Sequence, residues 1–214
     1  MNPKTSHSQD SSVLNRLNLS PSQANLDEHT LLISAQAAIQ LQATLLKNSI
    51  SHIQSVSGNL ILTTTLKSTL ETLTKYTESD QGSIFLIDQD GIIIESILAR
   101  GPVTRDLKDS LISKVLDDGL AGWTLRHRQI GLIYDTIADS RWIQLPDQPY
   151  KVRSALTIPL IYGVDVVGII TLTHAEANHY DEAIALMMQY SIESMTMIIL
   201  NAQLHSEYRS LGFK

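Results

Sequence analysis

The segment RSALTIPLIYGVDVVGIITLTH, residues Arg153–His174, constrains the fold of this chain more than any other. Two apolar runs of strand length, Ala155–Tyr162 and Val166–Leu172, flank a three-residue turn. A hairpin with one face in water alternates apolar and polar side chains. Both faces are apolar here: one carries Leu156, Ile158, Leu160 and Tyr162, and the other carries Ile161, Val167 and Ile169. The pattern predicts an antiparallel hairpin covered on both faces, by helices alone or by helices and a ligand pocket.

Composition narrows the class of protein. The chain has 214 residues, which is room for one good-sized domain with extensions. Its formal net charge of -6 gives no general attraction to nucleic acid or to an anionic membrane, so we expect neither as a partner. There is no cysteine, which excludes disulfides, cysteine nucleophiles, thiolate zinc sites and thioether-linked cofactors. This composition fits a cytoplasmic protein.

The two ends of the chain are expected to lie outside the folded part. Residues 1–27 are rich in Ser, Asn and Gln and lack the apolar core of a signal peptide, so they predict a disordered tail. Residues 209–214 predict a second, short tail. No uninterrupted apolar run reaches the ~18–20 residues that a membrane span needs.

The remaining patterns predict an alternation of helices and strands. Helices are expected at Glu28–Val56, Thr63–Thr77, Leu107–Leu116, Gly119–Arg128 and Asp181–Tyr208. Strands are expected at Gly82–Asp88, Ile92–Leu98 and Ile130–Tyr134, in addition to the hairpin. Because hairpins follow one another along the chain, the sheet should be antiparallel. We expect a separate helix over residues 28–57 and a domain over residues 58–208.

Several motifs in this order resemble a GAF domain. They are GSIFLIDQDG, GLAGWTLRHRQIGLIYDTIADSRW, RSALTIPLIYGVDVVGIITLTH and ILNAQL, and the resemblance spans about Leu60–Leu204. It implies an α+β, GAF/PAS-like fold: an antiparallel sheet of five or six strands, terminal helices on one face, and short helices and loops over the other. Many family members bind a small molecule in this second space and act in signal transduction.

No enzyme motif is present. The sequence has no GxSxG, HExxH, Gly-rich phosphate loop or DxDxDG calcium loop. One branch of the resembled family reduces free methionine sulfoxide with cysteines, and covalent tetrapyrrole attachment in the family also needs a cysteine. This chain has none, so we expect a non-enzymatic module. An unrecognised hydrolase or reductase is a third hypothesis, behind the two given below.

The resemblance places a ligand site between the sheet and the segment that covers its second face. The candidates are Trp123, Arg126, Tyr134, Asp135, Arg141, Trp142, Arg153, Thr171 and Thr173. The aromatic groups would wall a mostly apolar cavity and an arginine would meet an anionic group. In the alternative interpretation the arginines are solvated or pair with Asp135, Asp139 and Asp147, and the tryptophans pack in the core or its cover. The sequence does not name a cofactor, and non-covalent haem or pigment stays open.

Two weaker hypotheses concern the loop before the last helix. Residues Asn178–Glu182 resemble, with compressed spacing, a pattern found in cyclic-nucleotide-binding members. Asp181 is better explained as the N-cap of the helix, with Glu182 in its first turn. His174 and His179 could approach a metal but lack a defined third ligand, so we expect no metal site.

The first and last helices carry more apolar surface than one small domain covers. Leu32, Ile39, Leu46 and Ile53 recur at heptad spacing on the first helix, and Met195 and Ile198 lie on the last. We expect these six residues at a homodimer interface, although the first helix could instead fold back on its own domain. The hypothesis is a dimeric small-ligand sensor that acts on a downstream signalling protein. The alternative is a ligand-free dimerisation scaffold.

Overall fold

A computed structural model describes residues 27–55, 60–88, 92–98, 118–144 and 150–210. Its helices are α2 (Glu28–Ser55), α3 (Leu60–Tyr76), α5 (Leu120–His127) and α6 (Glu182–Ser210). Its strands are β1 (Gln81–Ile87), β2 (Ile93–Leu98), β3 (Gly131–Ile133), β4 (Ser154–Tyr162) and β5 (Asp165–His174). The predicted helix at 107–116 and both predicted tails, except Asp27 and the backbone of 209–210, lie outside the described residues.

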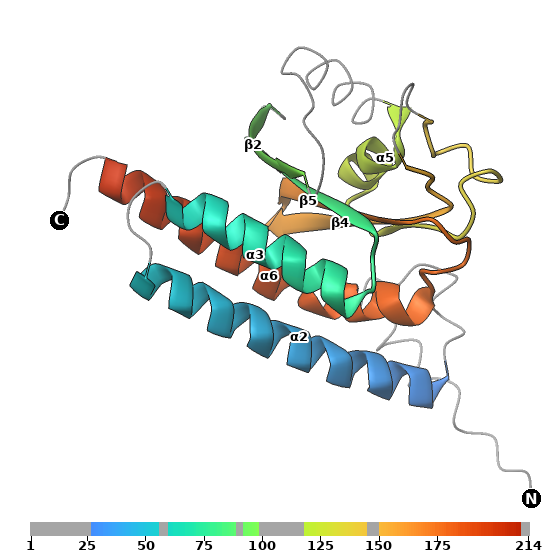
Figure 1. Cartoon of the computed structure of the whole chain (residues 1–214), viewed down its shortest axis with the longest axis horizontal. Coiled ribbons are helices and arrows are strands. Elements are labelled where there is room, and N and C mark those ends of the chain that lie inside the picture. Colours follow the sequence, from blue (N-terminus) through green and yellow to red (C-terminus); the bar gives the residue numbers. More distant parts are fainter. Residues whose placement is uncertain (1–26, 56–59, 89–91, 99–117, 145–149, 211–214) are drawn as a thin grey trace, which may run out of the picture.

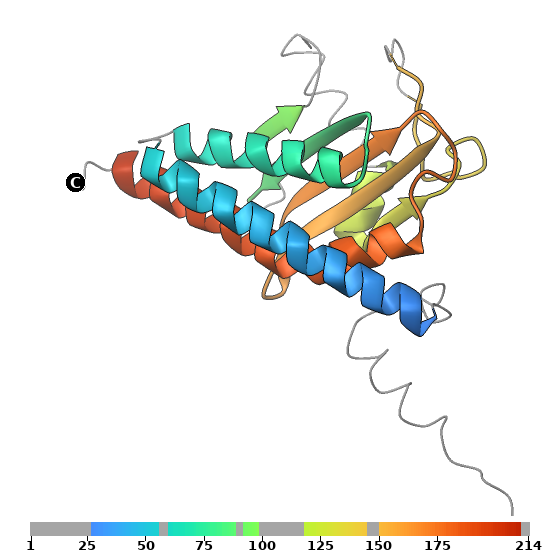
Figure 2. The ribbon, with the colours of Figure 1, turned by 60° about the horizontal axis from the view of Figure 1, so that its bottom comes forward.

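The five described strands form one antiparallel sheet in the order β2-β1-β5-β4-β3. The β4–β5 hairpin lies at its centre and pairs nine residues, from Ser154 with His174 to Tyr162 with Asp165. Figures 1 and 2 show α3 and α6 along one face of this sheet and α5 on the other. The predicted fold class is therefore confirmed, and the hairpin lies between two covers as its doubly apolar pattern required.

The helix-covered face holds most of the buried core. Leu156, Ile158 and Leu160 of β4 are fully buried in a cluster that also contains residues of α3 and α6. Burying an aliphatic side chain of this size contributes about 1.5–3 kcal/mol, so this cluster is the main source of stability. The same cluster contains Tyr180, which is fully buried just before α6 begins.

The opposite face is covered by α5 and the segment after β3. Leu120, Ile133 and Ala155 form a second buried cluster, and Trp142 packs against it. Gly131 makes the close approach of α5 possible, because a Cβ there would lie 2.8 Å from both Leu120 Cδ1 and Thr124 Oγ1. Segment 99–117, which the resemblance also assigns to this cover, is outside the described residues.

Helix α2 forms a third layer, on the side of α3 and α6 that faces away from the sheet (Figure 1). It folds back along its own domain, as the alternative interpretation proposed, and runs parallel to α6. Ser34 Oγ donates to the carbonyl of Ala183 (3.1 Å) and Gln42 Nε2 to that of Tyr190 (2.7 Å). The packed side of α2 consists of Ser34, Ala38, Leu41, Leu45 and Ser49.

The heptad row of α2 lies on the opposite side of the helix. Leu32, Ile39 and Leu46 are 66%, 66% and 53% exposed, and Ile53 is half-buried. In this chain the row therefore faces solvent, and packing against α3 and α6 leaves it uncovered.

Helix α6 is the central helix of the fold. It contacts α2, α3 and β4, so most of its sides are used within the chain. Met195 and Ile198 are accordingly buried, at 0% and 9% exposure, and this corrects their predicted place at a dimer interface. Among the side chains of α6 that the structure describes, the exposed large apolar ones are Met197 and Leu204 instead.

By length and composition, residues Glu182–Ser206 of α6 could also cross a membrane, with a mean hydropathy of 1.5. Single polar residues interrupt this stretch, so it does not stand out in the sequence as one apolar run. More than half of it is buried inside the protein, and a core helix passes the same test, so this is weak evidence for a span.

Candidate functional site

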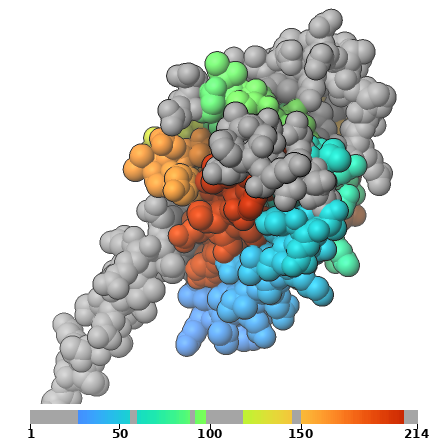
Figure 3. Space-filling model, turned by 90° about the vertical axis from the view of Figure 1, so that its left-hand side faces the viewer, coloured from blue at the N-terminus to red at the C-terminus, as the bar shows by residue number. Residues whose placement is uncertain are grey.

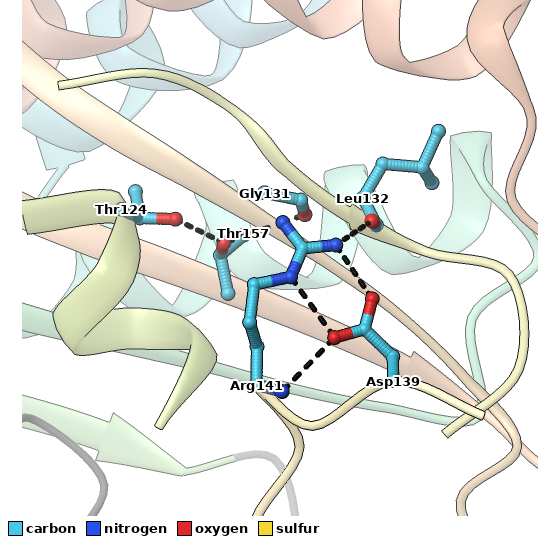
Figure 4. A network of polar contacts seen from close by, with 6 residues as sticks. All are labelled: Thr124, Gly131, Leu132, Asp139, Arg141 and Thr157. Atoms are coloured by element: carbon cyan, nitrogen blue, oxygen red, sulfur yellow. Dashed lines mark hydrogen bonds and ion pairs between the residues drawn. The ribbon is translucent and has the colours of Figure 1, made fainter. Parts of the chain in front are cut away.

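Arg141 holds the loop after β3 together. Its Nε donates to Asp139 Oδ1 (3.0 Å), and its Nη2 donates to Asp139 Oδ2 (2.6 Å) and to the carbonyl of Leu132 (2.8 Å). Figure 4 shows the guanidinium between these two partners. The bonds from Arg141 lower the pKa of the Asp139 carboxyl, although partial burial acts against them. The guanidinium also lies 4.9 Å from the centre of the Trp123 ring.

Arg153 makes a second pair, with Asp135. Its Nε and Nη2 donate to the two carboxylate oxygens at 2.9 Å and 2.5 Å, so the pair is bidentate. These bonds lower the pKa of the Asp135 carboxyl. Two of the three predicted ligand arginines, Arg141 and Arg153, are thus engaged by aspartates of the same chain, which is one form of the alternative interpretation of the sequence.

Tyr134 connects the loop to the last helix. Its hydroxyl donates to Glu182 Oε1 in the first turn of α6, and its carbonyl accepts from the backbone N–H of Asn178 (2.7 Å). Burial, followed by the contact with Glu182, raises the pKa of the Tyr134 hydroxyl. A change in the loop after β3 therefore has a direct route to the start of α6.

Threonine hydroxyls lie between α5 and the sheet. Thr124 of α5 hydrogen-bonds Thr157 of β4 (Figure 4), and Thr157 is the cross-strand neighbour of Thr171. Trp123 stacks on His127 with a centroid distance of 4.4 Å, and the His127 Nδ1 donates to the Trp123 carbonyl. These contacts bring polar and aromatic side chains close together on this face of the sheet.

The structure divides the nine predicted ligand residues into groups. Trp123, Arg141, Trp142 and Thr171 lie on the α5-covered side of the sheet, whereas Tyr134, Asp135 and Arg153 form the link to α6. Arg126 is exposed at the end of α5. Thr173 shares the face of Thr171, two residues earlier on β5, and it also lines a pocket at the end of the sheet.

That strand-end pocket was not predicted. Its volume is about 350 Å³, and it is lined by residues 79–81 at the start of β1, by Tyr150 and Lys151 before β4, and by residues 173–175 at the end of β5. These segments are far apart in the sequence and each is unremarkable by itself. The pairing of β5 with β1 on one side and with β4 on the other brings them together.

The loop before α6 is built as a helix start. Asp181 Oδ1 accepts the backbone N–H of Ile184 (2.9 Å), which makes Asp181 the N-cap. His174 and His179 stack with a centroid distance of 3.6 Å. Tyr180 is buried as well, so residues of the segment Asn178–Glu182 already make structural contacts within the chain.

Among the described residues, no group of three or more His, Asp or Glu could hold a metal ion.

Comparison with known families decides the class of this domain. The family model described as "GAF domain" matches residues 62–194, which is more than half of the chain. The chain belongs to the GAF domain family. The matched range falls within the domain predicted at 58–208 and includes most of α3, the sheet, α5 and the first part of α6. No curated protein matches the sequence.

Solved structures show the same fold at low sequence identity. The GAF domain of an Acinetobacter phosphoenolpyruvate-protein phosphotransferase is 19% identical, with 78% of this chain and 95% of that chain covered and a TM-score of 0.55. Its counterpart from Coxiella burnetii is 17% identical, with 83% and 98% covered and a TM-score of 0.55. A free methionine-R-sulfoxide reductase from Neisseria meningitidis, solved with its substrate, is 15% identical, with 78% and 92% covered and a TM-score of 0.55.

Proposed function

We propose that this GAF domain is a regulatory, non-enzymatic module of intracellular signal transduction that works as a homodimer. The outer face of α2 carries the proposal. Its exposed or half-exposed residues follow an unbroken 4/3 spacing: Leu32, Gln36, Ile39, Ala43, Leu46, Ile50 and Ile53. This is the spacing of a two-helix coiled-coil seam, and none of the helices that the structure describes covers it.

A second copy of the chain is the partner that this face fits. A seam that repeats every seven residues is complementary to itself, so a two-fold axis can place two α2 helices side by side. Gln36 is the one polar seam residue, and a single polar seam position can fix the register of such a pair. The parallel offset between α2 and α6 places Met197 level with Ile50, so α6 can extend the interface. Figure 3, an end-on view, shows α6 at the surface beside α2.

The proposed regulatory role rests on the contacts that connect the loop after β3 to helices α6 and α2. Tyr134 reaches Glu182 at the start of α6, and α6 packs along α2. A ligand or a downstream protein that shifts the loop after β3 would change the packing of both helices, which is a population shift between two arrangements. The reductase chemistry that the resemblance attributes to cysteines needs thiols, and this sequence has none.

Light scattering on the full chain tests the assembly. We expect a dimer at micromolar concentration and a folded monomer for Ile39→Asp combined with Leu46→Asp. The control is Gln40→Asp combined with Ser51→Asp, at exposed positions of α2 outside the seam, which should remain dimeric. A monomeric wild-type protein, or a dimer that survives the seam variant, would contradict the proposal.

A ligand-free dimerisation scaffold is the second candidate, and one observation favours it. Arg141 and Arg153 are both engaged by aspartates of the same chain. Native mass spectrometry of the freshly purified protein, together with an absorption spectrum, separates the two. A retained small molecule or pigment supports the sensor, and a bare dimer that no metabolite shifts supports the scaffold.

A further inference from the structure

The strand-end pocket lies apart from the cover of the sheet, where the family resemblance places a ligand. It forms where α3 runs into β1 and where β5 runs out toward α6. Its volume of about 350 Å³ falls in the range of small-metabolite sites, at the lower end. All but one of its lining residues have polar side chains, so the pocket suits a small polar molecule and not an apolar one.

The lining carries both signs of charge. Asp80 Oδ2 accepts the backbone N–H of Ala175 (2.8 Å), which fixes the position of the carboxylate. His174 Nδ1 accepts the backbone N–H of Glu176 (3.1 Å), so its proton is on Nε2, the atom that faces Asp80 Oδ2. These two atoms are 3.7 Å apart, too far for a hydrogen bond between them. Lys151 supplies a cation from the segment before β4.

We propose that this pocket binds a free α-amino acid through both of its charged groups. The ammonium would lie at Asp80, and the carboxylate would lie at Lys151 and the Nε2–H of His174. A simple anion would meet the Asp80 carboxylate, and a simple cation would meet Lys151. A zwitterion satisfies both at once, because each end makes a charge-assisted hydrogen bond.

The surroundings of the pocket connect this binding to α6. His174 stacks on His179, whose Nε2 donates to the carbonyl of Thr77 at the end of α3 (2.7 Å). Tyr180 donates its hydroxyl to Ser79 (2.8 Å), itself a lining residue. A molecule in the pocket would therefore tighten the junction between α3 and the start of α6. This gives the proposed dimer helices a second input, although binding itself does not depend on dimerisation.

Calorimetry on the full chain tests the proposal. The twenty proteinogenic amino acids are first screened at 10 mM by thermal shift, and the best is titrated by isothermal calorimetry. We expect one site per chain, and at least tenfold weaker binding for the matching amide and the matching acid without its amino group. Equal binding of the acid without its amino group would reveal a plain anion site and overturn the proposal, as would no thermal shift with any amino acid.

Two conservative variants locate the site. Asp80→Asn keeps an oxygen for the Ala175 N–H, and Lys151→Met keeps most of the apolar stem, so both should fold. Each should weaken binding about tenfold or more, which corresponds to one lost charge-assisted hydrogen bond. Lys47→Met, on the exposed side of α2, is the control and should bind as the wild type does. Unchanged affinity in Asp80→Asn and Lys151→Met would place any binding elsewhere and overturn the proposal, whatever the oligomeric state.

Discussion

At Gly168 the sheet leaves no room for a side chain. A Cβ there would lie 2.7 Å from the carbonyl oxygen of Phe85 and 3.0 Å from Leu160 Cδ1 and Leu86 Cδ2. Glycine is unfavourable in the middle of a strand, and here the close approach of cross-strand neighbours requires it. The crowding comes from the strands themselves, not from a ligand or a single helix.

Gly168→Val should therefore destabilise the domain by about 1–3 kcal/mol, because the leucines and the neighbouring strand must move. The measurement is the urea midpoint of unfolding. Val164→Ala, at a turn position that is 72% exposed, serves as the control and should leave the midpoint unchanged. A wild-type midpoint for Gly168→Val would show that the sheet adapts to the added volume.

The Asp139–Arg141 pair predicts a dependence on pH. The pKa of Asp139 is lower in the folded protein than its ordinary value of 3.8, so the carboxylate stabilises the fold above that value. The contribution is lost as the pH falls through the lowered pKa. Asp139→Asn should thus be less stable than wild type by about 1 kcal/mol at pH 7, and the difference should shrink below about pH 4.

Urea midpoints of both proteins at pH 7 and pH 3 measure this difference. Asp165→Asn, at the exposed β4–β5 turn, is the matched control. A gap for Asp139→Asn that stays constant down to pH 3 would show that the carboxylate acts through its shape and not through its charge.

At the scale of elements, α2 depends on small residues to pack closely on α6. Ser34, Ala38 and Ser49 are buried on its inner side, and none is larger than a hydroxymethyl group or a methyl group. The same helix has Ala43 on its exposed seam. One helix therefore offers an alanine in each environment, and this allows a direct comparison.

Ala38→Leu should destabilise the protein by about 1–3 kcal/mol, because three additional carbon atoms would push α2 away from α6. Ala43→Leu adds the same atoms on the seam and should not destabilise the fold. Thermal unfolding of the two variants measures the contrast. Equal midpoints would mean that α2 is loosely attached, and the layered arrangement would then contribute little to stability.

At the scale of the whole molecule, α6 joins every layer, since it contacts α2, α3 and the sheet. A dimer held by α2 and α6 would therefore be stabilised together with the fold. Association of folded chains raises the apparent stability by mass action. Folding and assembly should consequently be seen in a single transition.

The midpoint of thermal unfolding should rise with protein concentration between about 1 and 100 μM for the wild type. It should be independent of concentration for Ile39→Asp combined with Leu46→Asp. Scanning calorimetry at several concentrations provides the test. A wild-type midpoint that does not move over this range would argue for a monomer whose apolar seam binds something else.

The sequence alone determined the strands, the hairpin with two covered faces and the family. The strands and the hairpin could be predicted because the periodicity of apolar residues reports burial within one segment. The family could be predicted because each of its motifs is a continuous stretch of sequence. The seam of α2 was only partly predictable: Leu32, Ile39, Leu46 and Ile53 were found, but their heptad spacing does not say whether residues 35, 42 and 49 or residues 36, 43 and 50 complete the seam. The structure turns Gln42 and Ser49 inward and leaves Gln36, Ala43 and Ile50 outside. These two rows are offset by one residue along the helix, and only the packing of α2 on α6 decides which of them faces outward.

Tertiary structure also decided what the polar residues do. Whether Arg141 binds a ligand or pairs with Asp139 depends on how the loop after β3 folds. The amino-acid sequence of the loop is compatible with both. Met195 looked like an interface residue because periodicity cannot tell an internal neighbour from a second chain, and α6 has neighbours on most sides. The strand-end pocket joins Asp80 to His174 across the β1–β5 pairing. Such long-range contacts arise from chain topology, which no local pattern of residues records.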